Sequence, residues 1–412
     1  MRAFFHWAAA FLAVGLVSHC ATQGDDPGAA ATTLNWSSSS SAGGSMGGSA
    51  GMHGTGATGG GSGGGATTAS TGGSGSGGAP QGVIVLLARG ASQAFAGAYH
   101  EGQGWVTANL AGGGLDRPAV ALLADGTAVG LLRGANDQLR FTVWNQTSWS
   151  NLADVGPQIT TRASPALDAG HALYHGDNYM HYYAAYATQW SPSSEAVAPP
   201  NQPQSFGPSS AALAALGNEV VAAFAGSDTL LYVQTRANAT WSTAVPVTAS
   251  KIAQTPAIAA LSSGPELMIV YAHHEANQFD DKKLFFTTRT NGIWSSPLKI
   301  DDNVFTDEPV RLTALAQGGA LVTYRGTDGK GYWLRYDATL SSWSPPDAIA
   351  NPNPNITSAP DVTIGIGTTE AELVFIDAQD TTAYHTRLSA TWSVPTVIGG
   401  TGLAAVAVDS AP

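Results

Sequence analysis

The chain has 412 residues, of which 43% are hydrophobic and 11% charged, and it contains 50 glycines and 11 tryptophans. This composition favours strands joined by tight turns and argues against a helical protein. Its 17 basic and 29 acidic side chains give a formal net charge of −12, which would repel a phosphate backbone, so we expect no nucleic-acid partner.

Residues 1–20 have the pattern of a secretory signal peptide. Arg2 supplies a short basic region, and residues 8–17 form an apolar stretch too short to span a bilayer. Cys20 is the single cysteine and stands where the apolar stretch ends. Its placement resembles a bacterial lipobox, although His19 replaces the small residue usual there, and cleavage as an ordinary signal peptide is the alternative. Because no aspartate follows Cys20, the resemblance implies an exported protein, lipid-anchored to the bacterial outer membrane or cell surface.

Residues 21–79 consist mainly of glycine, serine, alanine and threonine. Such a segment cannot bury enough apolar surface to offset its chain entropy, so we expect a disordered Gly/Ser-rich linker. A Gly-x-Ser-x-Gly match at 60–64 has the spelling of a nucleophile elbow. Because no strand or helix is expected beside it, we interpret it as part of the linker.

Residues 80–412 contain an internal repeat, marked by a tryptophan every 41–53 residues. The seven tryptophans are Trp105, Trp149, Trp190, Trp241, Trp294, Trp343 and Trp392. Serine follows six of them, and a proline opens most units, as at Pro165 and Pro256. We expect the tryptophans to pack between neighbouring repeats, because a large ring at a fixed position suits sheet-on-sheet packing better than seven separate sugar sites.

Each repeat divides into four short strands separated by turn residues. In the fourth repeat the predicted strands are 210–216, 219–225, 229–235 and 240–247. A four-stranded unit of about 40–50 residues has the size of a propeller blade. The sequence therefore predicts an all-β fold, a seven-bladed β-propeller.

The two ends of the repeat array complement each other. The first repeat begins at 82–86, which matches the second strand of the other repeats, and 402–408 is a surplus strand that resembles an opening strand. We expect the last strand to complete the first blade, which closes the ring and leaves no exposed sheet edge.

The repeats resemble those of bacterial and fungal propeller lectins and, more loosely, those of the sialidase superfamily. The nearest match to a sialidase Asp box is 289–297, which reads Arg-Thr-Asn-Gly-Ile-Trp-Ser-Ser-Pro and lacks the aspartate of the box. The resemblance implies a carbohydrate-binding propeller. A sialidase would need an arginine cluster, a tyrosine nucleophile assisted by a glutamate, and an aspartate acid. The missing glutamate-tyrosine and Asp-box signatures disfavour catalysis.

A polar residue recurs at the end of the second strand in six repeats, as Arg89, Arg133, His175, His273, Arg325 and Asp377. Equivalent strand ends converge on one rim of a propeller. We predict a ligand site at the rim formed by Arg89, Arg133 and Arg325, because guanidinium groups bind the carboxylate of an acidic sugar through paired hydrogen bonds. Tyr324 and Trp333 would lie beside Arg325. Alternatively, Asp377 neutralises one arginine, or all of these are solvated charges beside turns.

Three classes of function remain open. We predict a non-catalytic cell-surface protein, lectin-like or adhesin-like, that binds carbohydrate or another surface ligand. The alternatives are a divergent sialidase-like glycosidase and an outer-membrane scaffold for protein interactions. We expect a glycan or a surface protein as partner, membrane contact through a lipid on Cys20, and a monomer. No cofactor and no metal are expected. The histidines at 171/175 and 273/274, the latter with Glu275, Asp280 and Asp281 in the same hairpin, suggest metal ligands, but a tetrahedral site needs three or four converging ligands and adjacent strand residues point to opposite faces.

Overall fold

The computed structural model describes residues 82–191, 195–197, 210–252, 254–274 and 282–411. The predicted signal peptide, 1–20, and the predicted linker, 21–79, lie outside these residues. The described residues form strands, turns and loops, so the all-β prediction is confirmed. No helix in this part of the chain is long and apolar enough to cross a membrane.

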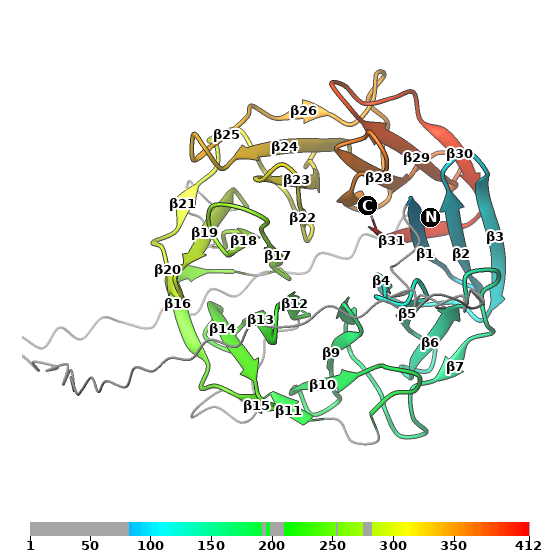
Figure 1. Cartoon of the computed structure of the whole chain (residues 1–412), viewed down its shortest axis with the longest axis horizontal. Helices are drawn as coiled ribbons and strands as arrows, with labels where there is room; N and C mark the ends of the chain where they lie inside the picture. Colours follow the sequence, from blue (N-terminus) through cyan, green and yellow to red (C-terminus); the bar gives the residue numbers. More distant parts are fainter. Residues whose placement is uncertain (1–81, 192–194, 198–209, 253, 275–281, 412) are drawn as a thin grey trace, which may run out of the picture. The chain divides into compact units, whose positions relative to one another are not determined.

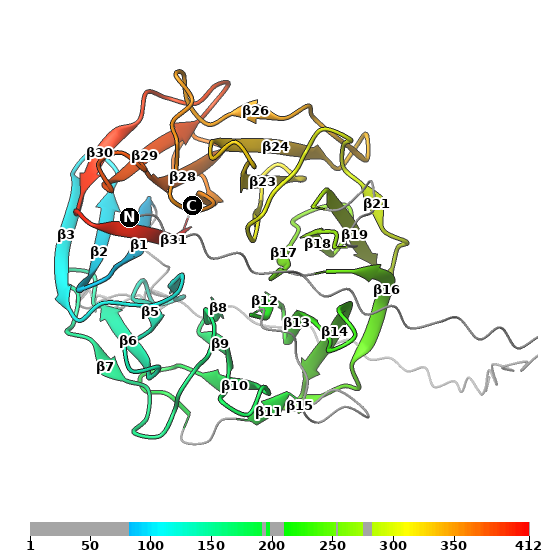
Figure 2. The same ribbon diagram turned by 180° about the vertical axis from the view of Figure 1, so that it is seen from behind.

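The strands form seven antiparallel sheets around a central axis, which confirms the predicted seven-bladed propeller (Figures 1 and 2). From the axis outwards, the first blade contains β31 (Leu403–Ala411), β1 (Val83–Gly90), β2 (Gln93–His100) and β3 (Gly104–Ala111). The second contains β4 (Ala119–Leu122), β5 (Ala128–Arg133), β6 (Leu139–Trp144) and β7 (Ala153–Asp154). The third contains β8 (Ala166–Asp168), β9 (His171–His175), β10 (His181–Ala185) and β11 (Glu195–Val197).

The fourth, fifth and sixth blades each carry an additional short strand. The fourth contains β12 (Ala212–Leu216), β13 (Glu219–Ala225), β14 (Leu230–Ala237), β15 (Thr240–Trp241) and β16 (Val245–Lys251). The fifth contains β17 (Ala257–Ala260), β18 (Leu267–Ala272), β19 (Leu284–Thr290), β20 (Ile293–Trp294) and β21 (Leu298–Lys299). The sixth contains β22 (Arg311–Ala314), β23 (Ala320–Arg325), β24 (Gly331–Asp337), β25 (Ser342–Trp343) and β26 (Asp347–Ala348). The seventh contains β27 (Asp361–Ile364), β28 (Ala371–Ile376), β29 (Ala383–Leu388) and β30 (Thr396–Gly399).

The last strand closes the ring as predicted. β31 is the innermost strand of the first blade and pairs antiparallel with β1, with Leu87 opposite Ala407 and Val85 opposite Asp409. Leu403 and Val406 of this strand are buried in the cluster between the first and seventh blades. The two ends of the propeller sequence therefore share one sheet and one apolar core.

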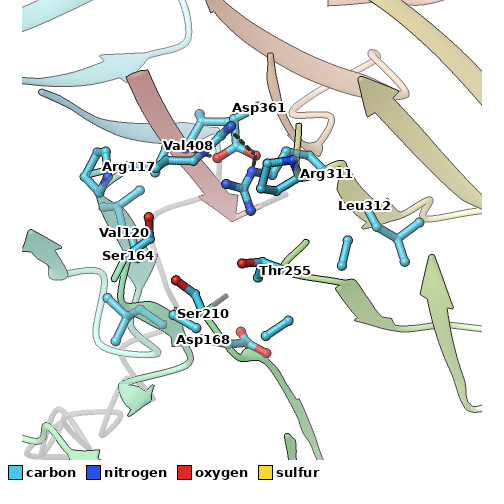
Figure 3. Close-up of a pocket in the computed structure, with 18 of the residues that line it drawn as sticks. Arg117, Val120, Ser164, Asp168, Ser210, Thr255, Arg311, Leu312, Asp361 and Val408 are labelled. Atoms are coloured by element: carbon cyan, nitrogen blue, oxygen red, sulfur yellow. Dashed lines mark hydrogen bonds and ion pairs between the residues drawn. The ribbon is translucent and has the colours of Figure 1, made fainter. Parts of the chain in front are cut away.

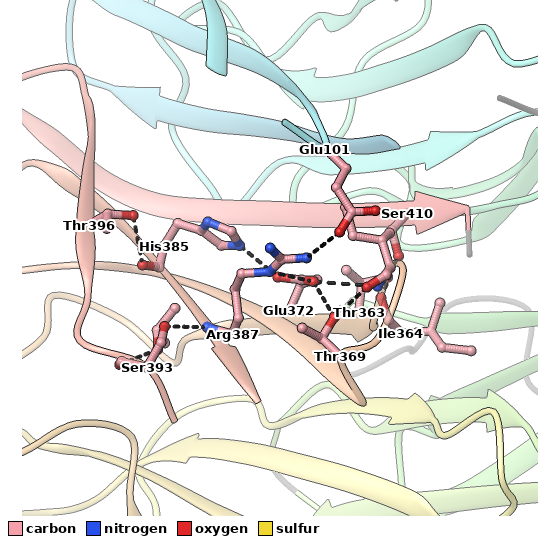
Figure 4. A network of polar contacts seen from close by, with 12 residues as sticks. Glu101, Thr363, Ile364, Thr369, Glu372, His385, Arg387, Ser393, Thr396 and Ser410 are labelled. Carbon is pink, nitrogen blue, oxygen red and sulfur yellow. Dashed lines mark hydrogen bonds and ion pairs between the residues drawn. The ribbon is translucent and has the colours of Figure 1, made fainter. Parts of the chain in front are cut away.

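A buried polar network also joins the seventh blade to the first (Figure 4). Glu372, which is fully buried, accepts hydrogen bonds from Arg387 Nε at 3.2 Å and from Thr369 Oγ1 at 2.6 Å, and Nε2 of His385 lies 2.8 Å from its second oxygen. Nη2 of Arg387 lies 3.6 Å from the Glu101 carboxylate, which follows β2. A buried carboxylate is stable only when it is paired and hydrogen-bonded, and here both conditions are met at the closure seam.

The repeated tryptophans pack between blades, as predicted. Five of them lie edge-on to an aromatic ring in the third strand of the preceding blade, with ring centroids 5.3–6.0 Å apart and interplanar angles of 76–87°. The pairs are Trp105 with His385, Trp190 with Phe141, Trp241 with Tyr183, Trp343 with Phe286 and Trp392 with Trp333. Edge-to-face contact is a preferred geometry for aromatic pairs. The tryptophan that recurs in each repeat therefore serves the packing of one blade on the next.

The serine that follows six of the seven tryptophans fixes the outer edge of its blade. Ser242 Oγ accepts the backbone N–H of Thr235 at 3.1 Å, and Ser295 Oγ accepts that of Thr288 at 3.1 Å. Ser150, Ser191, Ser344 and Ser393 do the same in their blades. Because the side chain takes an N–H that a fourth strand would otherwise bind, the predicted strand 240–247 is split into the separate strands β15 and β16.

Candidate functional site

The innermost strands of the blades surround a central channel with a volume of about 710 Å³. Its walls consist mainly of alanine and other small residues, together with the prolines that open the repeats, such as Pro165 and Pro256. These prolines precede β8 and β17. Small side chains at the axis leave the channel open, and the residues beside the prolines, at the starts of the innermost strands, determine its chemistry.

The residues at or just before the starts of the innermost strands, together with Arg89 near the end of β1, form what we call the channel mouth. Its charged half comes from the sixth, seventh, first and second blades, and its hydroxyl half from the third, fourth and fifth. The charged half comprises Arg89, Arg117, Arg311, Ser358 and Asp361, and the hydroxyl half comprises Ser164, Ser210 and Thr255. Figure 3 shows Arg117, Arg311 and Asp361 together on one side of the channel and the three hydroxyl residues on the opposite wall.

Asp361 lies between two arginines without a hydrogen bond to either. Its Oδ1 is 3.4 Å from Arg117 Nη2 and 3.8 Å from Arg311 Nε, while its Oδ2 accepts the backbone N–H of Val408 at 2.9 Å. Arg117 donates one hydrogen bond, from Nη1 to the carbonyl oxygen of Ala359 at 2.8 Å. The carboxylate therefore compensates charge at a distance but leaves most guanidinium N–H groups available.

Four buried polar atoms of the charged half have no hydrogen-bond partner among the described residues. They are Arg89 Nε, Arg117 Nη2, Arg311 Nε and Ser358 Oγ. All four can donate a hydrogen bond, and a buried donor left unpaired costs about 1–3 kcal/mol. Their concentration on one wall of the channel indicates a place for a ligand that accepts hydrogen bonds.

The two central arginines are cations in a desolvated environment. The pKa of Arg311 is lowered to about 9, chiefly by burial and next by repulsion from Arg117, while the attraction of Asp361 and Glu308 opposes the shift. Burial likewise lowers the pKa of Arg117, although Asp361 and Glu308 oppose the shift. Both shifts reflect guanidinium groups held away from water, where an additional anion would stabilise the charged form.

The side-chain hydroxyls of the hydroxyl half also lack hydrogen-bond partners among the described residues. In the part of the chain that the structure describes, the side-chain hydroxyls of Ser164, Ser210 and Thr255 make no hydrogen bond, and Ser210 is buried. Figure 3 shows these hydroxyls directed into the open part of the channel. A hydroxyl both donates and accepts, so this wall is suited to the hydroxyl groups of a polyol.

Two further carboxyl groups tie neighbouring blades together along the channel. Asp409 Oδ2 accepts the backbone N–H of Leu122 at 2.8 Å, and Asp168 Oδ2 accepts that of Ala215 at 2.7 Å. Burial raises the pKa of Asp409 to about 7, with repulsion from Asp168 as a smaller cause, and burial also raises the pKa of Asp168. Their oxygens are occupied by the protein itself, so we assign them to blade packing.

The arginines predicted from the sequence have different surroundings. Arg89 lines the channel and makes no side-chain hydrogen bond among the described residues. Arg133 is held by Asp116 and Asp137, each at 2.6 Å, and donates to the carbonyl oxygen of Arg162 at 2.8 Å. Arg325 contacts Glu308 at 3.2 Å and donates to the carbonyl oxygen of Ile356 at 2.9 Å. Of the three, Arg89 is the one that lines the channel, and its buried Nε has no hydrogen-bond partner among the described residues.

The other residues of the predicted site do not line the channel. Tyr324 is buried and stacked on Tyr332, and burial raises its pKa. Trp333 packs edge-on against Trp392 between the sixth and seventh blades. Asp377 Oδ1 accepts the backbone N–H of Gln379 within its own turn, at 2.7 Å, and contacts no arginine among the described residues. Ligand binding by these residues stays a prediction.

Sequence reasoning missed Arg117 and Arg311. Both stand at the opening of a repeat, where Arg117-Pro118 and Glu308-Pro309 are recognisable as the repeat's proline motif. For Arg117 the available signal was a cation just before the proline, where other repeats carry serine or threonine, as at Ser164 and Thr255. For Arg311 it was a cation two residues after the proline, where other repeats carry an apolar residue. The sequence does not show that these two arginines line a common channel. That follows from the arrangement of the innermost strands around the axis.

No protein-family model matches the chain, and no curated protein matches it in sequence. Three solved structures are similar to it. A fucose-binding lectin from Aleuria aurantia, a six-bladed β-propeller, is 13% identical with a TM-score of 0.46, over 69% of this chain and 95% of that chain. AofleA from Arthrobotrys oligospora is 9% identical with a TM-score of 0.42, over 82% and 92%. A polysaccharide lyase of family PL25, an ulvan lyase, is 12% identical with a TM-score of 0.46, over 70% and 85%. At these identities the likeness concerns the fold alone.

Proposed function

We propose that the protein is a non-catalytic binding protein that takes a saccharide into the mouth of its central channel. The observation that carries the proposal is the set of unpaired hydrogen-bonding groups on both halves of the mouth, with Arg89, Arg117, Arg311 and Ser358 on one side. Sugar hydroxyls donate and accept, so one saccharide can pair with both halves. The volume of about 710 Å³ lies within the range of small-molecule sites, which is roughly 300–1,000 Å³.

The surroundings of the acidic groups support binding rather than hydrolysis. Asp361 and Glu308 each accept a backbone N–H and face arginines, so the protein itself engages their oxygens. Tyr324, the residue that a sialidase-like mechanism would need as nucleophile, is buried between strands and stacked on Tyr332. These contacts give no acid and nucleophile pair directed at the channel.

The predicted rim arginines would act together with the channel mouth. Arg325 forms an ion pair with Glu308, and Arg133 forms one with Asp116. Neither carboxylate is therefore fully available to neutralise the arginines that line the channel. We propose that Arg89 contacts the ligand and that Arg133 and Arg325 hold these carboxylates in place around it.

A panel of immobilised glycans, probed with the full-length chain, tests the proposed function. The double variant Ser164→Ala/Thr255→Val removes two channel hydroxyls while keeping side-chain size, and should weaken binding of the glycans recognised by the parent by about three- to tenfold. Thr339→Val, at an exposed turn, is the matched control and should bind like the parent. Absence of glycan binding by the folded protein, or equal binding by the double variant, would contradict the proposal.

We also propose that the propeller is displayed outside the cell and anchored by a lipid on Cys20, a residue outside the described part of the chain. The support is the apolar stretch that ends at this single cysteine. Cys20→Ala should move the protein from the membrane fraction to the soluble exported fraction and abolish labelling with a radioactive fatty acid. Lipid labelling or membrane fractionation that the substitution leaves unchanged would refute the anchor.

A further inference from the structure

We infer that the saccharide carries an oxyanion, a carboxylate or a sulfate ester, which binds at Arg117 and Arg311 beside Asp361. The inference rests on the proposed function, since it assumes that the ligand occupies the channel mouth. It adds the charge class of the ligand and identifies the groups that recognise it, which differ from the rim arginines identified in the sequence.

The first argument is the balance of charge at the mouth. Arg89, Arg117 and Arg311 line the channel, and Asp361 is the carboxylate shared between two of them. Two other carboxylates of the lining are engaged by arginines of the rim, Glu308 by Arg325 and Asp116 by Arg133. Asp168 and Asp409 also line the channel, but they accept backbone N–H groups of neighbouring blades, and burial raises the pKa of both. Arg117 and Arg311 thus share one carboxylate, that of Asp361. In a desolvated site two cations on one carboxylate are unfavourable until a further anion arrives.

The second argument is the availability of guanidinium donors. Arg311 makes no side-chain hydrogen bond among the described residues, and its Nε is buried. Asp361 cannot move closer without losing the backbone N–H of Val408, which holds it at 2.9 Å. An external oxyanion can use the remaining donors, because two oxygens of a carboxylate or sulfate match the planar fork of a guanidinium group.

The third argument distinguishes an oxyanion on a saccharide from a neutral saccharide. A sugar hydroxyl can accept a hydrogen bond from an arginine but carries no charge, so it would leave Arg117 and Arg311 with the single carboxylate of Asp361. Ser164, Ser210 and Thr255 on the opposite wall are uncharged and suit the rest of the sugar ring. One half of the mouth therefore suits an acidic group and the other half suits hydroxyl groups. A single acidic sugar carries both kinds of group.

Matched pairs of probes test this inference with the full-length chain. Polygalacturonate is compared with its fully methyl-esterified form, and dextran sulfate with dextran, by titration calorimetry at constant ionic strength. The parent should bind at least one acidic member at least tenfold more tightly than its neutral partner. Preference for polygalacturonate identifies a carboxylate, and preference for dextran sulfate identifies a sulfate ester.

Substitutions at Arg311 assign the preference to the channel mouth. Arg311→Gln should abolish the preference for the acidic probe without changing the melting temperature, since this side chain makes no hydrogen bond that holds the fold together. Arg311→Lys keeps the positive charge but not the planar pair of N–H donors, and should retain part of the preference for the acidic probe. Arg335→Gln removes a partly exposed arginine outside the channel, paired with Glu370 at 2.6 Å, and should retain all of it.

The outcomes separate the inference from the proposed function. If the acidic and neutral probes of each pair bind equally, the inference of an oxyanion is wrong, while the proposal of saccharide binding stands. A preference that survives Arg311→Gln overturns the assignment to these arginines. Binding of inorganic sulfate with no binding of any saccharide, or no binding at all, contradicts both the proposed function and the inference built on it.

Discussion

The carboxylate of Asp409 accepts a hydrogen bond from the backbone N–H of Leu122 at 2.8 Å, although the two residues are 287 positions apart in the sequence. The contact joins β31, the last strand of the chain, to β4, the innermost strand of the second blade. The closing strand is therefore held on two sides, by β1 in its own sheet and by the neighbouring blade across the channel wall.

Removing the closing strand should destabilise the whole propeller. Deletion of residues 402–412 takes away the buried side chains of Leu403, Val406 and Val408, each worth about 1.5–3 kcal/mol, and exposes the edge of β1. We expect thermal unfolding of the truncated protein to lose its cooperativity or to shift down by more than about 10 °C. A synthetic peptide of residues 402–412 should restore part of the loss, and an unchanged melting temperature would show that the ring does not depend on β31.

Titration of the buried carboxyl group of Asp409 should make the stability of the protein depend on pH. Burial raises its pKa in the folded protein from 3.8 to about 7, so in this range the folded state binds the proton more tightly than the unfolded chain does. This group should therefore make the free energy of unfolding fall as pH rises through that window, by about 2–4 kcal/mol.

Asp409→Asn removes this titration, so the variant should gain stability relative to the parent as pH rises from 4 to 8. Urea unfolding at several pH values measures the effect, and Asp347→Asn, at an exposed position outside the channel, serves as the control. A stability difference between Asp409→Asn and the parent that is the same at every pH would show that Asp409 titrates normally.

The repeated serine should contribute to stability through its side chain. Ser295→Ala removes the acceptor of the Thr288 N–H, a hydrogen bond of 3.1 Å, and should lower the free energy of unfolding by about 1 kcal/mol. Ser296→Ala changes the adjacent exposed serine, whose side chain makes no hydrogen bond among the described residues, and should have little effect. Denaturant unfolding distinguishes the two, and equal effects would contradict the assigned role.

The fold was predictable because its determinants repeat. Trp105 to Trp392 recur at a fixed place in every blade, and the surplus strand at 402–408 matches the strand missing before 82. The contacts around the site were not predictable in the same way. Arg133 is engaged by Asp137 across its own hairpin, which the spacing allows, but also by Asp116, whose approach depends on how the chain enters the blade.

The two arginines of the channel mouth illustrate the same limit. Arg117 and Arg311 are adjacent because β4 and β22 face one axis, although they come from the second and sixth blades. No local pattern relates them, and their contact with Asp361 involves yet another blade. Repetition in the sequence predicts the ring, whereas the site arises from the places where individual repeats depart from the pattern.

The most direct measurement of the central claim is a crystal structure of the protein with an acidic oligosaccharide, for which a galacturonate trisaccharide is a suitable probe. The account predicts density for a sugar ring in the channel mouth, with its carboxylate within hydrogen-bond distance of Arg311 and Arg117 and its hydroxyls facing Ser210 and Thr255. A saccharide bound between blades or on the outer edge, with an empty channel mouth, would contradict it.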